Sequence, residues 1–188
     1  MSKDLILDPR FNWKKNETEL VSLIQSKYPD QVASGIVKVK PKDWKRLAPG
    51  NRGLMLRTVE KGSNKPTPLV AVPNNASLST IIHEVQHRDS SLKSPEKDWY
   101  TNLDSIISEE LDAETSAYKT KGREPTWRIV DAAISSAVRR GYSKAEIMGS
   151  IVRYLDREGY TPIPKSTRSW IWTRIQGWRE LYGKKQRS

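Results

Sequence analysis

The stretch that decides the fold is LSTIIHEVQH, residues 78–87. Leu78, Ile82 and Val85 recur at i, i+4 and i+7, which is the spacing of a helix that turns one apolar face toward a core. Residues 74–79 offer several side chains suited to cap the N-terminus of such a helix. The pattern therefore predicts a core-facing helix that runs through the whole stretch.

This helix carries the only two histidines of the chain, His83 and His87, with Glu84 after the first, which is the motif HExxH. Residues four apart share one face of a helix, so both imidazoles can bind one ion. The Glu84 carboxylate lies beside that face, where it can take a proton from a water molecule. Nitrogen and oxygen ligands suit zinc. The motif predicts a zinc site with Glu84 as the general base.

A catalytic zinc site takes three protein ligands. The chain has no cysteine and no further histidine, so the third ligand must be an oxygen donor. The densest acidic run is SEELDAE, residues 108–114, on a helix expected from about Trp99 to Lys121. Glu109, Glu110 and Asp112 are the candidates. Successive helical residues point about 100° apart, so Glu109 and Glu110 cannot face one ion equally.

With HExxH followed by Glu110-Leu-Asp-Ala113, the chain resembles the gluzincins, zinc metallopeptidases with a downstream glutamate on a following helix. The resemblance covers roughly residues 54–118. It implies that Glu110 is the third zinc ligand. It also implies that Glu114, one turn later, accepts a hydrogen bond from the N–H of a ligand histidine, that of His83. The activity implied is hydrolysis of a protein or peptide substrate.

The fold implied by this resemblance is α+β, with a zincin-like core of a small antiparallel sheet, an active-site helix and a glutamate helix. The sequence supplies strand candidates at residues 36–40, 54–60 and 68–72, and a short helix at 17–28. In gluzincins an edge strand beside the active-site helix receives the substrate peptide, and residues 68–72 are the candidate for it. Residues 1–15 are expected to form an irregular arm of a core domain spanning 1–123.

The reaction also needs a donor for the negative charge that develops on the substrate oxygen, in addition to zinc. Both histidines are already assigned as ligands. Tyr118, one turn beyond Glu114, is the first candidate for this catalytic role, followed by Tyr100 and Arg88.

Residues 124–188 predict an all-helical, tryptophan-rich extension. Its helices are expected from Pro125, from a capping box at Ser143-Lys-Ala-Glu146, and over about 166–182. Most of the tryptophan area is expected to cover the core. Arginines near the last helix give a second interpretation, in which aromatic and basic side chains contact nucleic acid bases or a partner protein.

The chain has 188 residues and a formal charge of +11. Residues 1–73 and 124–188 each carry an excess of seven positive charges, whereas residues 74–123 carry an excess of three negative charges. The basic flanks favour nucleic acid or a large assembly as a partner. No apolar run approaches the ~20 residues that span a bilayer, and the N-terminus has no secretory pattern. A cytoplasmic protein, or a component of an assembly such as a virion, is expected.

Two alternatives to the peptidase remain open from the sequence. One is a structural or interaction protein of a nucleoprotein or virion assembly, in which the zinc site is structural or relict. The other is a DNA-binding regulator that uses a helix-turn-helix around Arg139-Arg140 and the capped helix that follows it.

Overall fold

The computed structural model describes residues 4–63, 65–95, 102–120, 122, 129–160 and 162–185 of an α+β chain. The chain forms two compact units, Met1–Lys97 and Asp98–Ser188. The boundary between the units precedes the expected domain boundary at residue 123. The helix that carries the acidic run therefore belongs to the helical second unit, because its apolar side packs there.

The main sheet of the first unit has three strands in the order β2-β5-β3. Strand β5 (Leu69–Pro73) is central: β2 (Ile36–Val39) pairs with it in parallel, and β3 (Leu54–Leu56) pairs with it antiparallel. The expectation of an antiparallel sheet with residues 68–72 at its edge was wrong. Four consecutive buried residues at 69–72 leave neither face of β5 for solvent, which is typical of a central strand.

A second, two-stranded ladder joins the N-terminal segment to the same unit. Strand β1 (Leu5–Leu7) pairs antiparallel with β4 (Thr58–Glu60). The N-terminal segment is therefore not an irregular arm throughout. Residues 54–60 are not one strand either, because the chain leaves the β3 ladder at Arg57 and enters a different sheet.

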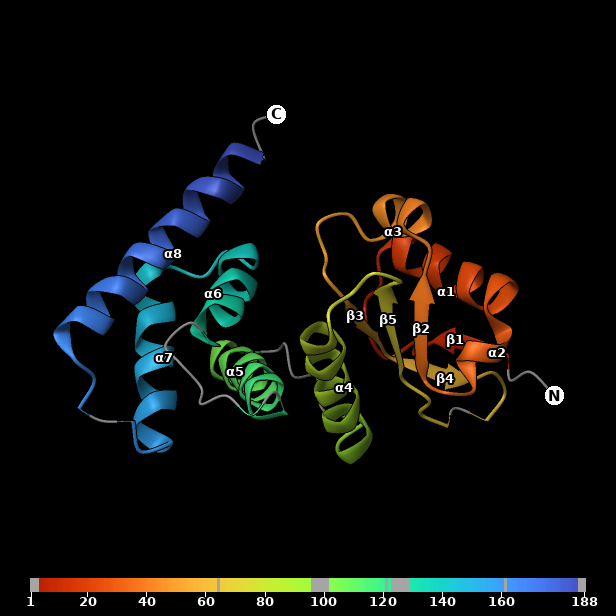
Figure 1. The fold of residues 1–188 in the computed structure, drawn as a ribbon, viewed down its shortest axis with the longest axis horizontal. Helices are drawn as coiled ribbons and strands as arrows, with labels where there is room; N and C mark the ends of the chain where they lie inside the picture. Colours follow the sequence, from red (N-terminus) through yellow and green to blue (C-terminus); the bar gives the residue numbers. More distant parts are fainter. Residues whose placement is uncertain are drawn as a thin grey trace. The chain divides into compact units, whose positions relative to one another are not determined.

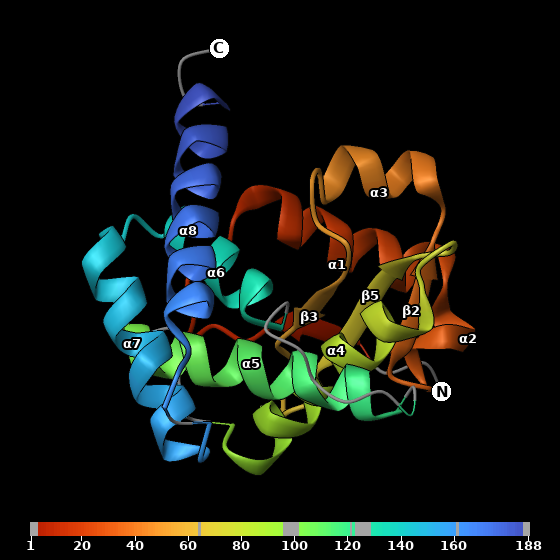
Figure 2. The ribbon, with the colours of Figure 1, turned by 60° about the vertical axis from the view of Figure 1, so that its left-hand side comes forward.

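Helices cover both faces of the main sheet (Figures 1 and 2). Leu69 and Ala71 of β5 pack into a core with α1 (Lys15–Lys27), as part of the buried cluster of this unit. Alternate residues of a strand point to opposite faces, so Val70 and Val72 face the side covered by α4 (Leu78–Lys93). Two short helices, α2 (Pro29–Val32) and α3 (Pro41–Leu47), were not expected; each begins with proline at its first turn.

The second unit consists of helices, as expected for the extension. They are α5 (Leu103–Thr120), α6 (Val130–Arg139), α7 (Lys144–Arg157) and α8 (Lys165–Lys185). Figure 2 shows α8 running along α6 and α7. The predicted capping box is present: the Ser143 hydroxyl accepts from the Glu146 N–H, and the Glu146 carboxylate accepts from the Ser143 N–H. The expected helix start at Pro125 lies outside the described residues.

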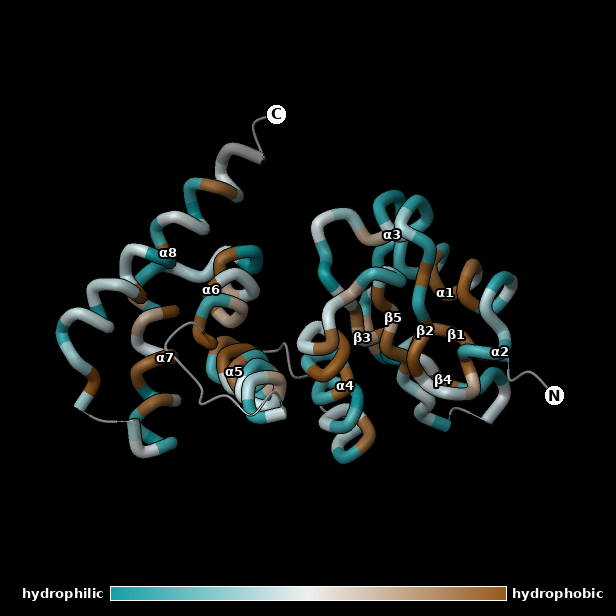
Figure 3. The backbone as a smooth tube through the Cα atoms, viewed as in Figure 1, coloured by the Kyte–Doolittle hydropathy of each residue, from teal (hydrophilic) through white to brown (hydrophobic). Residues whose placement is uncertain are grey.

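The hydropathy of the residues differs from element to element (Figure 3). Hydrophobic colour gathers on β2, β5 and parts of α6 and α7, whereas α8 is mostly neutral to hydrophilic. Among the described residues, no helix combines the length and the apolar character needed to cross a membrane.

Candidate metal centre

Helix α4 holds the HExxH motif well inside its ends. Its N-terminus is capped by Ser77, whose hydroxyl accepts a hydrogen bond from the Thr80 N–H at 3.2 Å. This cap satisfies one of the free N–H groups of the first turn, so the helix is regular where it reaches His83. The motif residues then follow over two central turns of a 16-residue helix.

The two histidine rings converge on one point. Nε2 of His83 and Nε2 of His87 lie 3.0 Å apart, and the rings stand at 84° to each other. Two nitrogens that bind one tetrahedral zinc at 2.0–2.1 Å are about 3.3 Å apart. The pair is therefore nearly at the separation that a shared ion requires, which the i, i+4 spacing predicted.

Glu110 completes a group that can hold a metal ion. One ligand atom from each of His83, His87 and Glu110 lies within 4.8 Å of the other two. His87 and Glu110 are buried, at 4% and 9% exposure, and His83 is half-buried. Two imidazole nitrogens and one carboxylate oxygen form a donor set that fits zinc and leaves a fourth position open.

The alternative ligands on α5 have other surroundings. The Asp112 carboxylate accepts a hydrogen bond from the Tyr154 hydroxyl of α7 at 2.6 Å, and partial burial raises the pKa of Asp112. Glu109 is buried at 5% exposure. Among the described residues, the group that can hold a metal contains Glu110 and neither of these two.

Glu84 is buried against the start of strand β3. Its exposure is 9%, and a Cβ placed on Gly53 would lie 2.6 Å from the Glu84 Cγ and 2.8 Å from its Oε1. Strand β3, which begins at the next residue, is held to β5 by the pairing of Leu54 with Ala71. Gly53 thus forms a wall for the Glu84 side chain on a fixed part of the sheet.

Sequence reasoning missed Gly53. Six other glycines have positive φ values, but the φ of Gly53 lies outside that range, so its backbone does not require glycine. The requirement is space for Glu84, which is 31 positions further along the chain. A glycine directly before a strand normally indicates only a turn, so no local pattern could have identified it.

The remaining predicted residues have the following positions. Glu114 is half-buried on α5, one turn after Glu110. Tyr118 packs against the apolar core of the second unit, which gives its ring a structural role. The Arg88 guanidinium pairs with Asp89 at 3.1 Å. Tyr100 lies outside the described residues.

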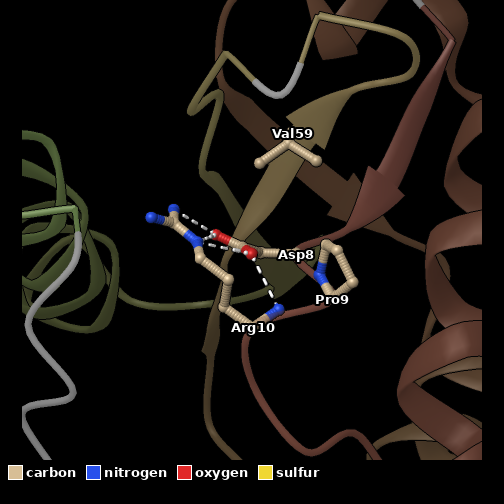
Figure 4. A pocket seen from close by; sticks show the side chains of 4 residues that line it. All are labelled: Asp8, Pro9, Arg10 and Val59. Atoms are coloured by element: carbon tan, nitrogen blue, oxygen red, sulfur yellow. Dashed lines mark hydrogen bonds and ion pairs between the residues drawn. The ribbon is translucent and has the colours of Figure 1, made fainter.

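One pocket of the first unit is lined by none of the predicted site residues. It is lined by Asp8, Pro9, Arg10 and Val59 (Figure 4). The Arg10 guanidinium folds back to donate to both Asp8 carboxylate oxygens, and this hydrogen bonding lowers the pKa of Asp8. The charged groups in this pocket pair with each other, so a structural role explains them.

Comparison with protein-family models, curated proteins and solved structures finds no match for this chain.

Proposed function

We propose that this chain is a zinc-dependent metallopeptidase with a zincin-like core, in which His83, His87 and Glu110 hold the ion. The observation that carries the proposal is the convergence of the two histidine nitrogens, 3.0 Å apart, with a buried carboxylate within 4.8 Å.

Bound zinc supplies a Lewis acid that polarises a peptide carbonyl and lowers the pKa of a water molecule. Glu84 acts as the general base: its carboxylate takes the proton from water as the oxygen attacks the carbonyl carbon. The same carboxyl group then gives the proton to the leaving amine nitrogen as the C–N bond breaks. The wall formed by Gly53 restricts the orientations that this carboxylate can adopt.

Strand β3 is the proposed docking edge for the substrate. It is an edge strand of the main sheet, it packs against α4, and it begins beside the residue that contacts Glu84. An extended peptide that pairs with β3 would gain backbone hydrogen bonds without depending on its side chains. This role replaces the one expected for residues 68–72, which are central in the sheet.

The test is metal analysis combined with cleavage of casein. The purified chain should contain about one zinc, and both wild type and Glu84→Gln should retain it. Wild type should cleave casein in a chelator-sensitive way, whereas Glu84→Gln should be slower by about 10²–10⁴-fold. Equal cleavage by the two proteins would refute the role of Glu84.

A matched pair of variants tests the third ligand. Glu110→Gln should weaken zinc affinity by at least ~100-fold, whereas Glu109→Gln, the adjacent buried glutamate, should bind zinc as wild type does. A chain that takes up no zinc at neutral pH would overturn the proposal. A chain that binds zinc but cleaves neither casein nor itself would favour the structural alternative.

A further inference from the structure

One exposed face of α8 is basic from Lys165 to Arg179. Lys165, Arg168 and Arg179 are exposed on it, and at about 100° per residue they lie within an arc of about 80° that also contains Trp172 and Gln176. The five positions extend over about 21 Å of helix axis. No aspartate or glutamate occupies a position within this arc.

Tyr142, in the turn between α6 and α7, and Lys144, the first residue of α7, adjoin this face. The Lys144 Nζ lies 4.2 Å from the centre of the Trp172 ring and 3.4 Å from the Gln176 Oε1. The Arg179 guanidinium donates a hydrogen bond to the Tyr142 carbonyl at 3.1 Å. These contacts add a fourth cation and hold it in place. We call the following set the α8 basic face: Lys144, Lys165, Arg168, Trp172, Gln176 and Arg179.

Two carboxylates lie near this face, and among the described residues neither forms an ion pair with one of its cations. The Glu146 carboxylate accepts from the Ser143 N–H at 2.8 Å, and Glu180 accepts from the Gln176 amide at 2.7 Å. The ion pair formed by the described part of α8 joins Arg174 to Asp131, away from the basic arc. The cations of the face therefore keep their charge available for an external anion.

Trp172 differs from the neighbouring tryptophans of its helix. Trp170 and Trp178 pack against the core of the second unit, and Trp178 also stacks on Tyr182. The Trp172 side chain is instead 44% exposed in the middle of the cations. The Lys144 ammonium lies over one face of this ring, and the exposed remainder is a surface on which an unpaired base can stack.

We propose that the α8 basic face binds single-stranded nucleic acid, with its four cations on the phosphates and Trp172 stacked on a base. The charge complementarity favours a polyanion over an apolar partner, and the exposed ring favours one with unpaired bases. The inference does not depend on the peptidase, because every residue of the face belongs to the second unit and none is a proposed metal ligand.

The experiment measures fluorescence anisotropy of a labelled 20-nucleotide DNA strand, and of its duplex, with the full chain. Binding of the strand should weaken as salt rises, with a slope of log K against log salt of up to about −3 for four phosphate contacts. Arg168→Glu with Arg179→Glu should weaken binding at least tenfold and make the slope shallower by about 1.4. Trp172→Ala should weaken binding of the single strand by about 5- to 150-fold, and that of the duplex less.

The matched control is Lys42→Glu with Lys45→Glu, two exposed cations of α3 in the first unit that make the same change in net charge. This variant should bind the strand within about twofold of wild type at 0.15 M salt, since neither cation belongs to the α8 basic face and salt screens general charge effects. Glu84→Gln should also bind normally, which separates this inference from the peptidase proposal.

Three results would overturn the inference. One is the same loss of affinity in the control as in the face variants, which would indicate a general charge effect. Another is no binding of either DNA at 50 mM salt. The third is binding of polyglutamate through the same face with no binding of DNA, which would make the partner an acidic protein.

Discussion

Helices α4 and α6 bury opposite kinds of side chain. The buried residues of α4 are Glu84, His87 and Ser91, whereas α6 buries an apolar stripe that includes Val130, Ile134 and Ala137. The sequence predicted that α4 turns an apolar stripe, Leu78, Ile82 and Val85, toward a core. In α4 that stripe is partly exposed: Leu78, its first member, is 61% exposed, and Ile82 and Val85 are only half-buried.

The difference shows that α6 stabilises the fold by apolar burial, whereas α4 places polar side chains in the interior. Burial of apolar area stabilises a fold by about 25 cal/mol per Å², and α6 receives that benefit on its packed side. Burial of carboxylate and imidazole groups opposes folding unless each group gains a partner. The buried residues of α4 are polar, so this helix receives less of the apolar contribution than α6 does.

The largest expected effect on stability comes from truncating one apolar side chain in the buried stripe of α6. Ile134→Ala should lower the free energy of unfolding by about 2–5 kcal/mol, because the side chain is fully buried. The matched variant on α4, Leu78→Ala, should change it by no more than about 0.5 kcal/mol. Urea unfolding followed by circular dichroism measures both. Equal losses would mean that the stripe of α4 is as structural as that of α6.

An intermediate effect is expected where α4 meets β3. Gly53→Ala should destabilise the protein by about 1–3 kcal/mol, because the new methyl group would overlap the Glu84 side chain. In a Glu84→Ala background the overlapping atoms are absent, so the same substitution should be neutral or slightly stabilising. Urea unfolding of wild type, the two single variants and the double variant gives the coupling free energy between Gly53→Ala and Glu84→Ala.

The control for this cycle is Gly177→Ala, a helical glycine whose Cβ would meet no atom within 4 Å. It should not lower stability in either background. If Gly53→Ala were equally destabilising with and without the Glu84 side chain, the contact between these two residues would not be the reason for glycine at position 53.

The smallest effect is expected at the surface contact between α5 and α7. The hydrogen bond from Arg153 to Asp104, at 2.7 Å, lowers the pKa of Asp104, with a further contribution from Ser150. A carboxyl group with a lowered folded-state pKa stabilises the protein above its unfolded-state pKa, and the stabilisation is lost as pH falls through the folded-state value. Asp104→Asn should therefore destabilise at pH 7, by no more than about 1 kcal/mol because the pair is exposed.

The pH dependence distinguishes this contact from an apolar one. The difference in unfolding free energy between wild type and Asp104→Asn should shrink as the pH falls below about 4, the usual Asp value. The loss of unfolding free energy in Ile134→Ala should stay the same over this pH range. A pH-independent deficit in Asp104→Asn would contradict the electrostatic explanation.

Local signals in the sequence identified most helices and the centre of the candidate site. The capping box at Ser143 is confirmed because its two hydrogen bonds join residues three positions apart. The convergence of His83 and His87 follows from helical spacing alone. The choice of Glu110 over its neighbours came from the resemblance, and the described metal-ligand group agrees with it.

The features that the sequence did not predict depend on contacts between distant residues. Pairing of β1 with β4 joins residue 5 to residue 60, and no local pattern at Leu5 specifies that partner. The run from Leu54 to Glu60 contains no glycine, proline, asparagine or aspartate to indicate a break, so its division at Arg57 between two sheets is visible only in three dimensions. The need for glycine at position 53 was not predicted for the same reason, because it depends on contact with Glu84.

The central position of β5 also has a consequence for the order in which the first unit folds. Strands β2 and β3 both precede β5 in the chain, and β5 is their neighbour in the main sheet. The ladder of β2 with β5 closes a loop of more than 30 residues, which slows folding relative to the contacts between successive helices in the second unit. On the ribosome, neither strand can pair in this sheet until β5 has emerged. The histidine helix follows β5 directly, so it can dock only after all three strands of the main sheet have been made.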